Sequence, residues 1–424
     1  MARLKVFVGI DWGSAEHQVH VIQETGEDST RIAHDGSAIK KLLDRFEELV
    51  NEDPEEIGVA IERKHGPLVE ALLDRGFSVF SINPKQLDRF RDRHSVAGAK
   101  DDRLDAFVLA QSLMTDRRCY RQLVAEESAL VELRSLNRER EGLNKDRLQR
   151  TNRLRDQLWR YYPQILELSP GADEAWVWDL LELALTPAAG ASLKRAKVAE
   201  VLKRRRIRRL NAREVIKCLR KAPVFVAPGV VEGATGQVRR LVQQLWLLRE
   251  QIKEVEGALE QALERLQEPT APDQGEAPHE HRDAEIALSF PGAGTVVVAT
   301  LLAEASDAIA RRDYQQLRAL SGVAPVRRST GRRDSPHWKG PIPATMRRAK
   351  NGRLSQALHW WAFVAIRRDK AARAQYDALR GRGHNQARAL RSVGDRLLRL
   401  LTAALRNGTL YDTSNLHGTY SQAA

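Results

Sequence analysis

The stretch Val6-Phe-Val-Gly-Ile-Asp11 decides the fold of the first part of this chain. Its Val, Phe and Ile residues predict a buried central strand, and Asp11 stands at the end of that strand. The strand would therefore deliver a carboxylate to the edge of a sheet. On this stretch alone, an aspartate that merely starts a turn explains Asp11 equally well.

The segments that follow predict a mixed sheet covered by helices. Tight turns join the first strands, which gives an antiparallel meander. We expect further elements in this order: strands at 17–23 and 29–34, a helix that Ser37 caps, a strand at 56–62, a helix at 67–75, a strand at 77–82 and a helix after Pro84. The order βββαβαβα is that of a ribonuclease H-like sheet, so the fold class is α/β for this part and α for the rest.

Four carboxylates can converge at the end of this sheet. Glu62 ends the fourth strand, and Asp102 and Asp105 share a face of the helix that Lys100-Asp-Asp-Arg-Leu-Asp-Ala106 opens. Clustered carboxylates repel one another unless cations occupy the cluster, and Mg²⁺ is the usual solution. Two such ions clamp the attacking and leaving oxygens in phosphodiester chemistry. Helix capping explains Asp101 and is the competing explanation for Asp102.

The amino-acid composition favours one class of binding partner and one cellular compartment for this protein. The chain has 424 residues, enough for about two or three domains, and a formal net charge of +13. That charge favours a polyanionic partner, nucleic acid ahead of a membrane surface. Cys119 and Cys218 have no metal-ligand spacing, which favours a reducing compartment and argues against zinc. No apolar run approaches the length of a membrane span, so we expect a cytoplasmic protein.

The middle of the chain is helical. Apolar residues recur three and four apart from Val238 to Leu266, which predicts a coiled-coil seam, within the chain or with a second copy. In the earlier helix at 125–162, Asn137 stands in a heptad pattern that fixes register or simply faces solvent. The cations of 203–209 would attract phosphates, and a solvated helix face is the alternative explanation.

The last part of the chain carries two further candidate sites. In Phe290-Pro-Gly-Ala-Gly-Thr295, Gly292 and Gly294 would let backbone amides at a helix start approach a phosphate, as in a helix-hairpin-helix element. Downstream, arginines flank two hydroxyls, which suits a nucleophile at a phosphodiester because cations stabilise the developing charge. These residues are Ser329 and Thr330 with Arg327, Arg328, Arg332 and Arg333. A basic loop that binds the backbone without reacting is the alternative, and residue chemistry alone favours it.

Together these motifs resemble the insertion-sequence-110 family of transposases over most of the chain. Gly9-Ile-Asp11, Glu62 and residues 100–106 match that family's RuvC-like DEDD domain, and residues 291–294 and 322–325 match its C-terminal transposase domain. The resemblance implies that Asp11, Glu62, Asp102 and Asp105 are the catalytic, metal-binding acids. Asp101 falls in the threonine column of the family's Lys-Thr-Asp-x-x-Asp-Ala motif.

This chain differs from the family at the position where members usually carry the proposed nucleophilic serine. Members usually carry Ser-Gly five residues beyond the proline of Gly-Leu-Ala-Pro, whereas this chain has Thr330 there and Ser329 just before it. Either Thr330 attacks, or a shift of one residue presents Ser329, or this copy is impaired. A primary hydroxyl is less hindered, which slightly favours Ser329.

The resemblance implies a bacterial recombinase that excises and inserts its own element as double-stranded DNA. A structured guide RNA from the element's end would specify the sites, and the protein would act on the nucleoid as a dimer or tetramer, with Mg²⁺ and without ATP. The implied domains are a RuvC-like domain at 1–124, a helical and coiled-coil region at 125–268, a linker at 269–284, a transposase domain at 285–410 and a tail at 411–424.

Other functions remain open on the sequence. A RuvC-type nuclease that hydrolyses branched DNA needs the four acids but no hydroxyl, and it is the strongest rival. A sugar kinase or actin-like ATPase would use residues 9–14 as a phosphate loop, but the second Asp-Gly loop that those folds require does not occur. A non-enzymatic DNA-binding protein would need neither the acids nor the hydroxyl.

Overall fold

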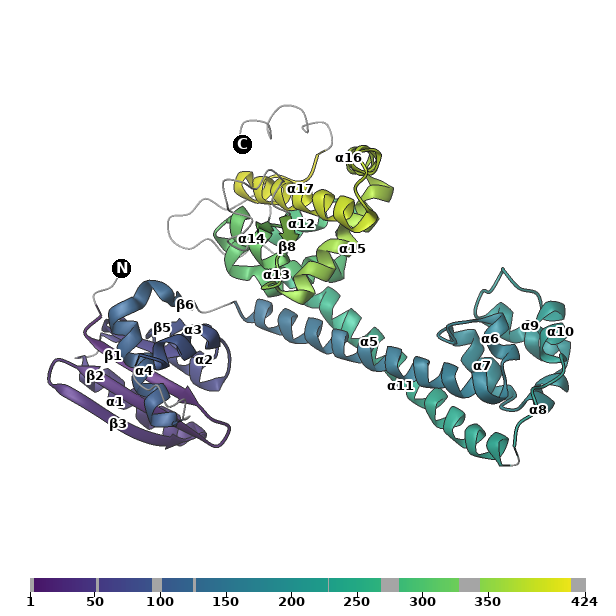
Figure 1. The fold of residues 1–424 in the computed structure, drawn as a ribbon, viewed down its shortest axis with the longest axis horizontal. Helices are drawn as coiled ribbons and strands as arrows, with labels where there is room; N and C mark the ends of the chain where they lie inside the picture. Colours follow the sequence, from purple (N-terminus) through teal and green to yellow (C-terminus); the bar gives the residue numbers. More distant parts are fainter. Residues whose placement is uncertain are drawn as a thin grey trace, which may run out of the picture. The chain divides into compact units, whose positions relative to one another are not determined.

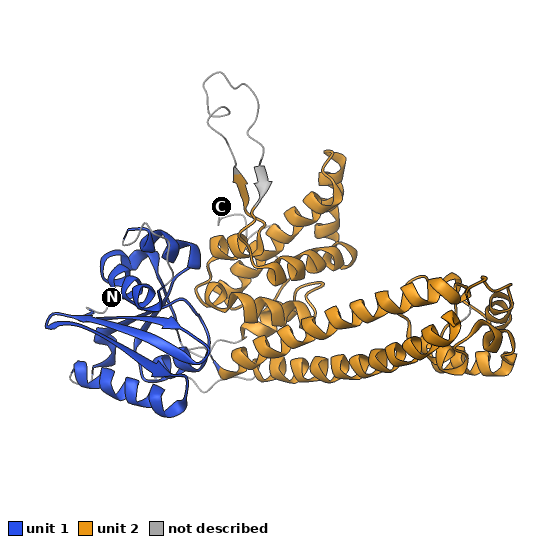
Figure 2. Cartoon of the chain, turned by 60° about the horizontal axis from the view of Figure 1, so that its bottom comes forward, with its two compact units in different colours: residues 1–127 blue, residues 128–424 orange. Residues whose placement is uncertain are grey.

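The computed structural model describes residues 4–50, 53–93, 101–124, 127–227, 229–267, 282–327 and 344–412. The chain divides into two compact units, residues 1–127 and 128–424 (Figure 2). The first contains the sheet and the second is mainly helical, which confirms the predicted fold class at that level. The finer division of the second unit into helical region, linker and transposase domain stays a prediction.

The first unit is built on a six-stranded sheet with strand order β3-β2-β1-β4-β5-β6 (Figure 1). β1 pairs antiparallel with β2 and parallel with β4, so it is the central strand that its apolar run predicted. The strands are β1 (Val6–Trp12), β2 (Glu16–Gln23), β3 (Gly26–Ala33), β4 (Ile57–Ile61), β5 (Ser78–Ser81) and β6 (Arg121–Gln122). The helices are α1 (Gly36–Leu49), α2 (Pro67–Asp74), α3 (Pro84–Arg91) and α4 (Asp102–Asp116).

Two helix starts in this unit show how local side chains set the boundaries. The Asp35 carboxylate accepts hydrogen bonds from the backbone N–H groups of Ser37 and Ala38, both at 2.9 Å, so Asp35 caps α1. The prediction that Ser37 is the cap was therefore wrong by two residues. Asp101 caps α4 as expected, accepting from the N–H of Arg103 at 3.0 Å.

Helix α4 lies directly on β1 because residue 9 has no side chain. A Cβ atom added to Gly9 would lie 1.9 Å from the Ala106 carbonyl oxygen and 2.5 Å from the Ala110 backbone nitrogen. Such distances are far inside van der Waals contact, so only glycine permits this approach. The helix axis is thereby held against the strand that ends in Asp11.

The second unit is organised on two long helices, α5 (Ser128–Tyr161) and α11 (Val230–Arg265), which pack along each other. Ion pairs between Arg140 and Glu256 (2.7 Å) and between Arg265 and Glu132 (2.5 Å) show that they run antiparallel. The apolar seam of α11 is buried, and its partner is α5 of the same chain. Of the two partners that the sequence left open for this seam, the structure shows a helix of the same chain.

A small helical module joins the far ends of this pair (Figure 1). We call it the distal module; it consists of α6 (Gln164–Leu168), α7 (Ala175–Leu183), α8 (Pro187–Ala191), α9 (Arg195–Arg204) and α10 (Ala212–Leu219). Its core includes fully buried Trp176 and Trp178 together with the apolar seam residues Leu154 and Leu241 of the long helices. The module is thus an insertion between α5 and α11 whose core continues theirs.

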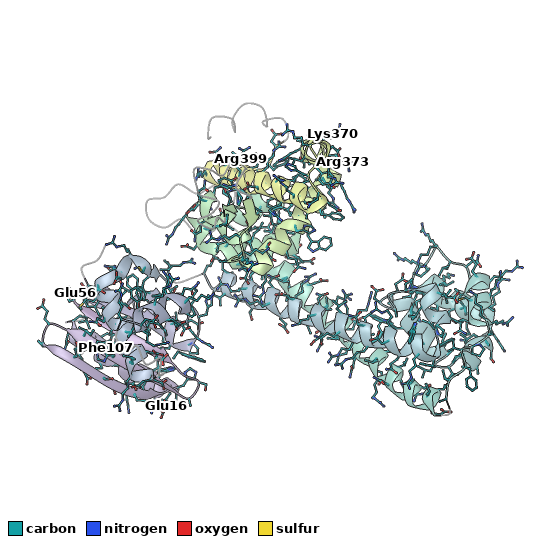
Figure 3. The ribbon with its side chains drawn as sticks, viewed as in Figure 1. Glu16, Glu56, Phe107, Lys370, Arg373 and Arg399 are labelled. Carbon is teal, nitrogen blue, oxygen red and sulfur yellow. The ribbon has the colours of Figure 1, made fainter. Side chains whose placement is uncertain are left out.

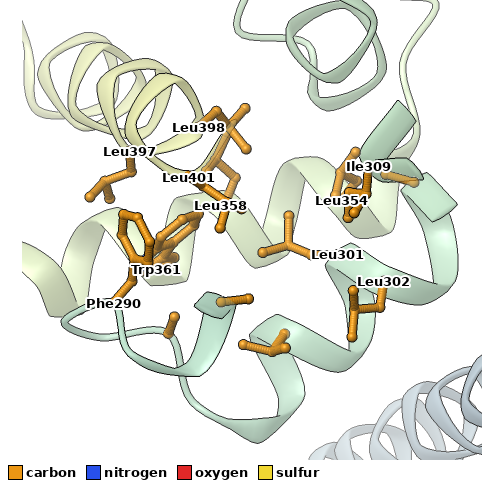
Figure 4. Packing of buried hydrophobic residues seen from close by; sticks show 14 of the residues in the cluster. Phe290, Leu301, Leu302, Ile309, Leu354, Leu358, Trp361, Leu397, Leu398 and Leu401 are labelled. Atoms are coloured by element: carbon orange, nitrogen blue, oxygen red, sulfur yellow. The ribbon is translucent and has the colours of Figure 1, made fainter. Parts of the chain in front are cut away.

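The remaining elements form a second core beside the near end of α5. They are α12 (Asp283–Leu288), α13 (Thr295–Ala310), α14 (Tyr314–Ser321), β7 (Pro325–Arg327), β8 (Ala344–Met346), α15 (Gly352–Arg368), α16 (Lys370–Gly381) and α17 (Gln386–Asn407), called here the C-terminal elements. Leu301 of α13, Trp361 of α15 and Leu397 of α17 meet in this core (Figure 4). Phe290 packs edge-to-face on Trp361, with ring centroids 5.8 Å apart.

Buried polar contacts fix the C-terminal elements to α5. The Arg134 guanidinium donates to the Ala303 carbonyl oxygen at 2.8 Å, and the Asn137 amide donates to the Thr300 hydroxyl at 3.1 Å. Asn137 is 6% exposed and its partner lies on α13. It therefore docks α13 on α5, whereas the sequence offered only register or solvent exposure for this asparagine.

Across the described ranges, no helix combines the length and the apolarity that crossing a bilayer requires.

Substituting Gly9 tests the close approach of α4 to β1. In the full chain we expect Gly9→Ala to lower stability by about 2 kcal/mol, because the new methyl group forces the helix off the strand. Gly142→Ala is the control: nothing lies within 4 Å of a Cβ there, and alanine favours the helix. Urea unfolding gives the stability change, and hydrogen exchange in β1 and α4 localises it. Equal midpoints for Gly9→Ala and the wild type would contradict the packing.

Candidate active site

Asp11 and Glu62 stand side by side at the end of two parallel strands. Ile10 of β1 pairs with Ile61 of β4, so the next residue on each strand is one of the two acids. Both are partly buried. Because side chains alternate along a strand, Asp11 lies on the same sheet face as Gly9, the face that α4 covers.

Helix α4 runs antiparallel to β1, which brings its first turn toward this end of the sheet. Ala106 lies over Gly9, whereas Leu113 near the end of the helix lies by Gly58, 3.2 Å from a Cβ added there, and Gly58 pairs with Phe7 at the start of β1. The first turn, with exposed Asp102, therefore extends toward Asp11. The structure thus gathers Asp11, Glu62 and the start of α4 at one end of the sheet.

Asp105 is not free to join them in this structure. Its carboxylate accepts two hydrogen bonds from the Arg91 guanidinium, from Nε at 2.5 Å and from Nη2 at 2.8 Å. Both side chains are largely buried, and Arg91 also binds Asp88 at 2.9 Å. The charge of Asp105 is therefore balanced by a residue of α3, which also explains why a carboxylate is tolerated among the apolar residues of α4.

The residues at this end fit a magnesium site in their chemistry but only partly in their arrangement. Carboxylate oxygens are the ligands that Mg²⁺ prefers. Within the described ranges, however, no three Asp, Glu, His or Cys side chains lie close enough together to hold one metal ion. Asp11, Glu62 and Asp102 belong to this end of the sheet but do not form such a group, and Arg91 occupies both oxygens of Asp105.

Neighbouring side chains tie the two strand ends together. The Arg63 guanidinium, next to Glu62, lies over the Trp12 ring at 3.4 Å from its centroid, and Trp12 follows Asp11. Fully buried His17 pairs with Trp12 in the sheet, and its Nε2 lies 2.8 Å from His34 Nδ1. Burial, and then the charge of His34, lower the pKa of His17. His17 therefore joins β2 to His34 next to Trp12, and its lowered pKa favours the neutral imidazole.

The predicted nucleophiles lie in the second unit and outside the described residues. Ser329, Thr330, Arg328, Arg332 and Arg333 fall in the gap between β7 and β8. Arg327 is the last residue of β7, where it pairs in register with Ala344 of β8. The sequence that carries both hydroxyls therefore starts and ends on two paired strands.

Gly292 and Gly294 line a cavity of about 720 Å³, but the reasons for the two glycines differ. Gly292 has φ +83°, and a Cβ there would lie 2.8 Å from the Ala365 backbone nitrogen, so packing against α15 requires glycine. Gly294 opens α13 with nothing within 4 Å of its added Cβ. Glu256 and Glu260 also line this cavity and would repel a phosphate. Phosphate binding by these glycines stays a prediction.

A buried carboxylate anchors the chain just after β8. Glu304 of α13 accepts from the Asn351 amide at 2.7 Å and from Arg138 of α5 at 3.1 Å, and Asn351 in turn caps α15. Burial alone would raise the pKa of Glu304. The hydrogen bonds from Arg138 and Asn351, with the charges of Arg138 and Arg353, hold that pKa below its ordinary value.

Three of the six cations of residues 203–209 form ion pairs within the distal module. Arg204 and Arg205 both bind buried Asp179, and Arg209 binds Glu174 at 2.5 Å. Lys203, Arg206 and Arg208 are exposed. Neither sequence interpretation of residues 203–209 anticipated a structural role for three of their arginines.

Further exposed cations lie on the C-terminal elements, among them Lys370 and Arg373 of α16 and Arg399 of α17 (Figure 3).

Arg91 is the residue of this region that the sequence analysis missed. It lies fourteen positions before Asp105 in a stretch of alternating charges, and no spacing rule links the two. A buried acid beside apolar residues was the available signal, since such an acid needs a cationic partner.

Comparison with known proteins points to one family. A family model described as transposase, and named for a DEDD domain and IS110, matches residues 8–163. A second, described as transposase of the IS116/IS110/IS902 family, matches residues 284–377.

Similar whole proteins agree with these matches. The mini-circle putative transposase for IS117 of Streptomyces coelicolor is 34% identical over 99% of both chains. A 42 kDa protein of the insertion element IS900 of Mycobacterium paratuberculosis is 29% identical over 96% of this chain and 97% of its own length. Putative transposase y4uE of Sinorhizobium fredii is 42% identical over 54% of this chain, and the match spans 62% of that relative.

Asparagine substitutions separate the structural role of Asp105 from that of Asp102. We expect Asp105→Asn to lower stability by about 3 kcal/mol, because it leaves the buried Arg91 without its counter-charge. Exposed Asp102→Asn should leave the urea midpoint unchanged. The double variant Arg91→Met/Asp105→Leu should recover most of the loss, as both charges are removed together. A midpoint for Asp105→Asn equal to that of wild type would show that the ion pair does not support the fold.

The Glu304 contacts should weaken in acid. A folded-state pKa held below the ordinary value means that ionised Glu304 contributes stability above that ordinary value, about 4.3, and that this contribution is lost as the pH falls through the lowered pKa. The difference in unfolding midpoint between wild type and Glu304→Gln should therefore be constant near neutrality and shrink below about pH 4. A difference that grows in acid would contradict the ion-pair network.

Proposed function

The chain belongs to the IS110 family of transposases, and we propose that it cuts and rejoins the DNA of its own insertion sequence through a covalent bond between a protein hydroxyl and the DNA. It is a DNA transposase by its relatives. The observation that carries the finer proposal is the gathering of Asp11, Glu62 and the start of α4 at one end of the sheet.

The sheet supports a RuvC-like domain for the first unit. Three antiparallel strands are followed by two parallel ones, in the order β3-β2-β1-β4-β5, and an acid follows in register at the end of each of the two central strands. A ribonuclease H-like domain would have its strands in this order, which supports the proposal. In the proposal, the domain supplies the acids and the C-terminal elements supply the hydroxyl.

Asp11, Glu62 and Asp102 are the proposed metal ligands, and Asp105 joins them only when Arg91 releases it. Bound Mg²⁺ would neutralise the clustered acids and stabilise charge on the oxygens around the phosphorus. Arg63 follows Glu62 in the sequence and stacks on Trp12, which follows Asp11. It would orient a DNA phosphate at this end of the sheet.

In the covalent step, the hydroxyl oxygen of Ser329 or Thr330 bonds to phosphorus as the bond from phosphorus to one deoxyribose oxygen breaks. The hydroxyl proton passes to the departing oxygen, so one phosphodiester replaces another. Because the bond is exchanged and not hydrolysed, the reverse attack by a second DNA end rejoins the strand without ATP.

The remaining partners belong to the same proposal. A structured guide RNA would specify the site by base pairing, and the basic surfaces would hold both nucleic acids by their backbones. Assembly as a dimer or tetramer would bring two DNA ends together in the bacterial cytoplasm, where the chromosome lies.

A metal-dependent nuclease that hydrolyses branched DNA is the second candidate function. The acids at the sheet end serve it equally well, because water replaces the hydroxyl. The threonine at position 330 favours it, since the family usually carries serine in that column.

Trapping the protein on DNA distinguishes the two functions. We expect full-length protein, incubated with Mg²⁺, nicked element-end DNA and RNA transcribed from that end, to form a covalent adduct on Ser329 or Thr330. Mass spectrometry of the digested adduct identifies the residue. Ser329→Ala and Thr330→Ala, tested separately, should leave the adduct in one variant and abolish it in the other.

Asp11→Asn serves as the catalytic control. It should cut DNA at least 100-fold more slowly than wild type, about 2.7 kcal/mol in the barrier, while still binding DNA. Cleaved DNA without an adduct would replace the recombinase by the nuclease. Cleavage by Asp11→Asn at the wild-type rate would reject both.

A further inference from the structure

A second cavity, of about 400 Å³, lies beside the two short strands of the C-terminal elements. Residues 321–323, which lead into β7, and residues 350 and 352, which follow β8, line one part of it. Helices α15 and α17 supply the rest. None of the described residues that line it is acidic, whereas Lys350, His359 and Arg391 are basic residue types. The cavity is thus an electropositive hollow beside the residues that lead into β7 and those that follow β8.

A close backbone approach holds the lysine of this cavity in place. Gly322 has φ +77°, and a Cβ there would lie 2.4 Å from the Lys350 Cδ atom. The lysine stem therefore lies on the glycine, and its ammonium donates to the Ser355 hydroxyl at 2.8 Å. Lys350 and Ser355 are both half-buried, as is Arg391 on α17. These three groups are the donors that a phosphate oxygen requires.

An exposed tryptophan stands at the same cavity. Trp360 is 51% exposed, whereas its neighbour Trp361 is fully buried and donates from Nε1 to the Pro291 carbonyl oxygen at 3.2 Å. His359 and Phe363 both meet the Trp360 ring edge-to-face with centroids 5.7 Å away. Half of the Trp360 surface is nevertheless exposed, and an exposed indole is a stacking platform for a nucleobase.

We propose that this cavity binds one unpaired nucleotide, with its phosphate on Lys350, Ser355 and Arg391 and its base stacked on Trp360. The proposal rests on the proposed function, because strand exchange leaves unpaired nucleotides at the cut. A base inside a duplex is stacked on both faces by its neighbours and has no free face for Trp360. The cavity at Gly292 differs, since two glutamates line it and oppose a phosphate.

Binding measurements on the full-length protein test the site without any cleavage. Fluorescein-labelled oligothymidylate, oligouridylate and a DNA duplex of equal length are titrated in EDTA, and anisotropy reports the affinity. We expect Trp360→Ala to weaken single-strand binding about tenfold and to leave duplex binding unchanged. We expect Arg391→Gln to weaken it too, and to flatten the slope of log affinity against log salt by about 0.7, as for one lost phosphate contact.

Matched controls exist for both variants. Trp159→Ala removes a tryptophan that is 74% exposed on α5, and Arg388→Gln removes an exposed cation one turn before Arg391 on the same helix. Both controls should bind single strands like wild type. Circular dichroism confirms that all four variants are folded, and the sites chosen are exposed or half-buried.

The outcomes separate this site from the proposed function. Weaker oligothymidylate binding in both Trp360→Ala and Arg391→Gln supports a DNA nucleotide in the cavity, and a loss confined to oligouridylate assigns the cavity to RNA. Wild-type affinity for both single strands in the two variants overturns the site even if the enzyme still forms its adduct. Cleavage by Asp11→Asn at the wild-type rate would reject the proposed function and leave these binding results standing.

Discussion

The missing side chain at Gly9 is the constraint on which the acidic end of the sheet depends. It lets the backbone of α4 rest on the backbone of β1, and this contact sets how far the first turn of the helix reaches past the strand. Asp101 caps that turn, and its exposed amides favour negative charge at Asp102. The position of one helix relative to one strand thus decides which carboxylates meet.

Sequence patterns predicted the features that depend on residues close together in the chain. The apolar run of β1, the acids at strand ends and the apolar seam of α11 are found where they were expected. What the sequence did not reveal depends on partners far along the chain. Arg91 binds Asp105 across a stretch with no regular spacing, and Asp179 takes two arginines of the basic run. The short edge strand β6 has two exposed polar residues and therefore no apolar signal.

Polar contacts give the second unit its internal order. Asn137 and Thr300 join α5 to α13, and Glu304 then links α5 to the cap of α15, just after β8. The Asn137–Thr300 contact is buried and the Glu304 side chain is 5% exposed, so both are costly to leave without a partner. Asn351, just after β8, is consequently linked through Glu304 to the same helix that bears the distal module, although that helix lies more than a hundred positions earlier in the chain.

Helices α5 and α11 pair antiparallel, so together they set the distance between the distal module and the C-terminal elements. Two distant parts of the sequence must therefore match in length. α5 has 34 residues and α11 has 36. At 1.5 Å per residue, each heptad adds about 10 Å to the separation of the distal module from the C-terminal core. A deletion in one helix alone would shift every facing pair, from Arg140 and Glu256 onward. In a relative whose helix pair is longer or shorter, we therefore expect insertions or deletions of equal length in both helices.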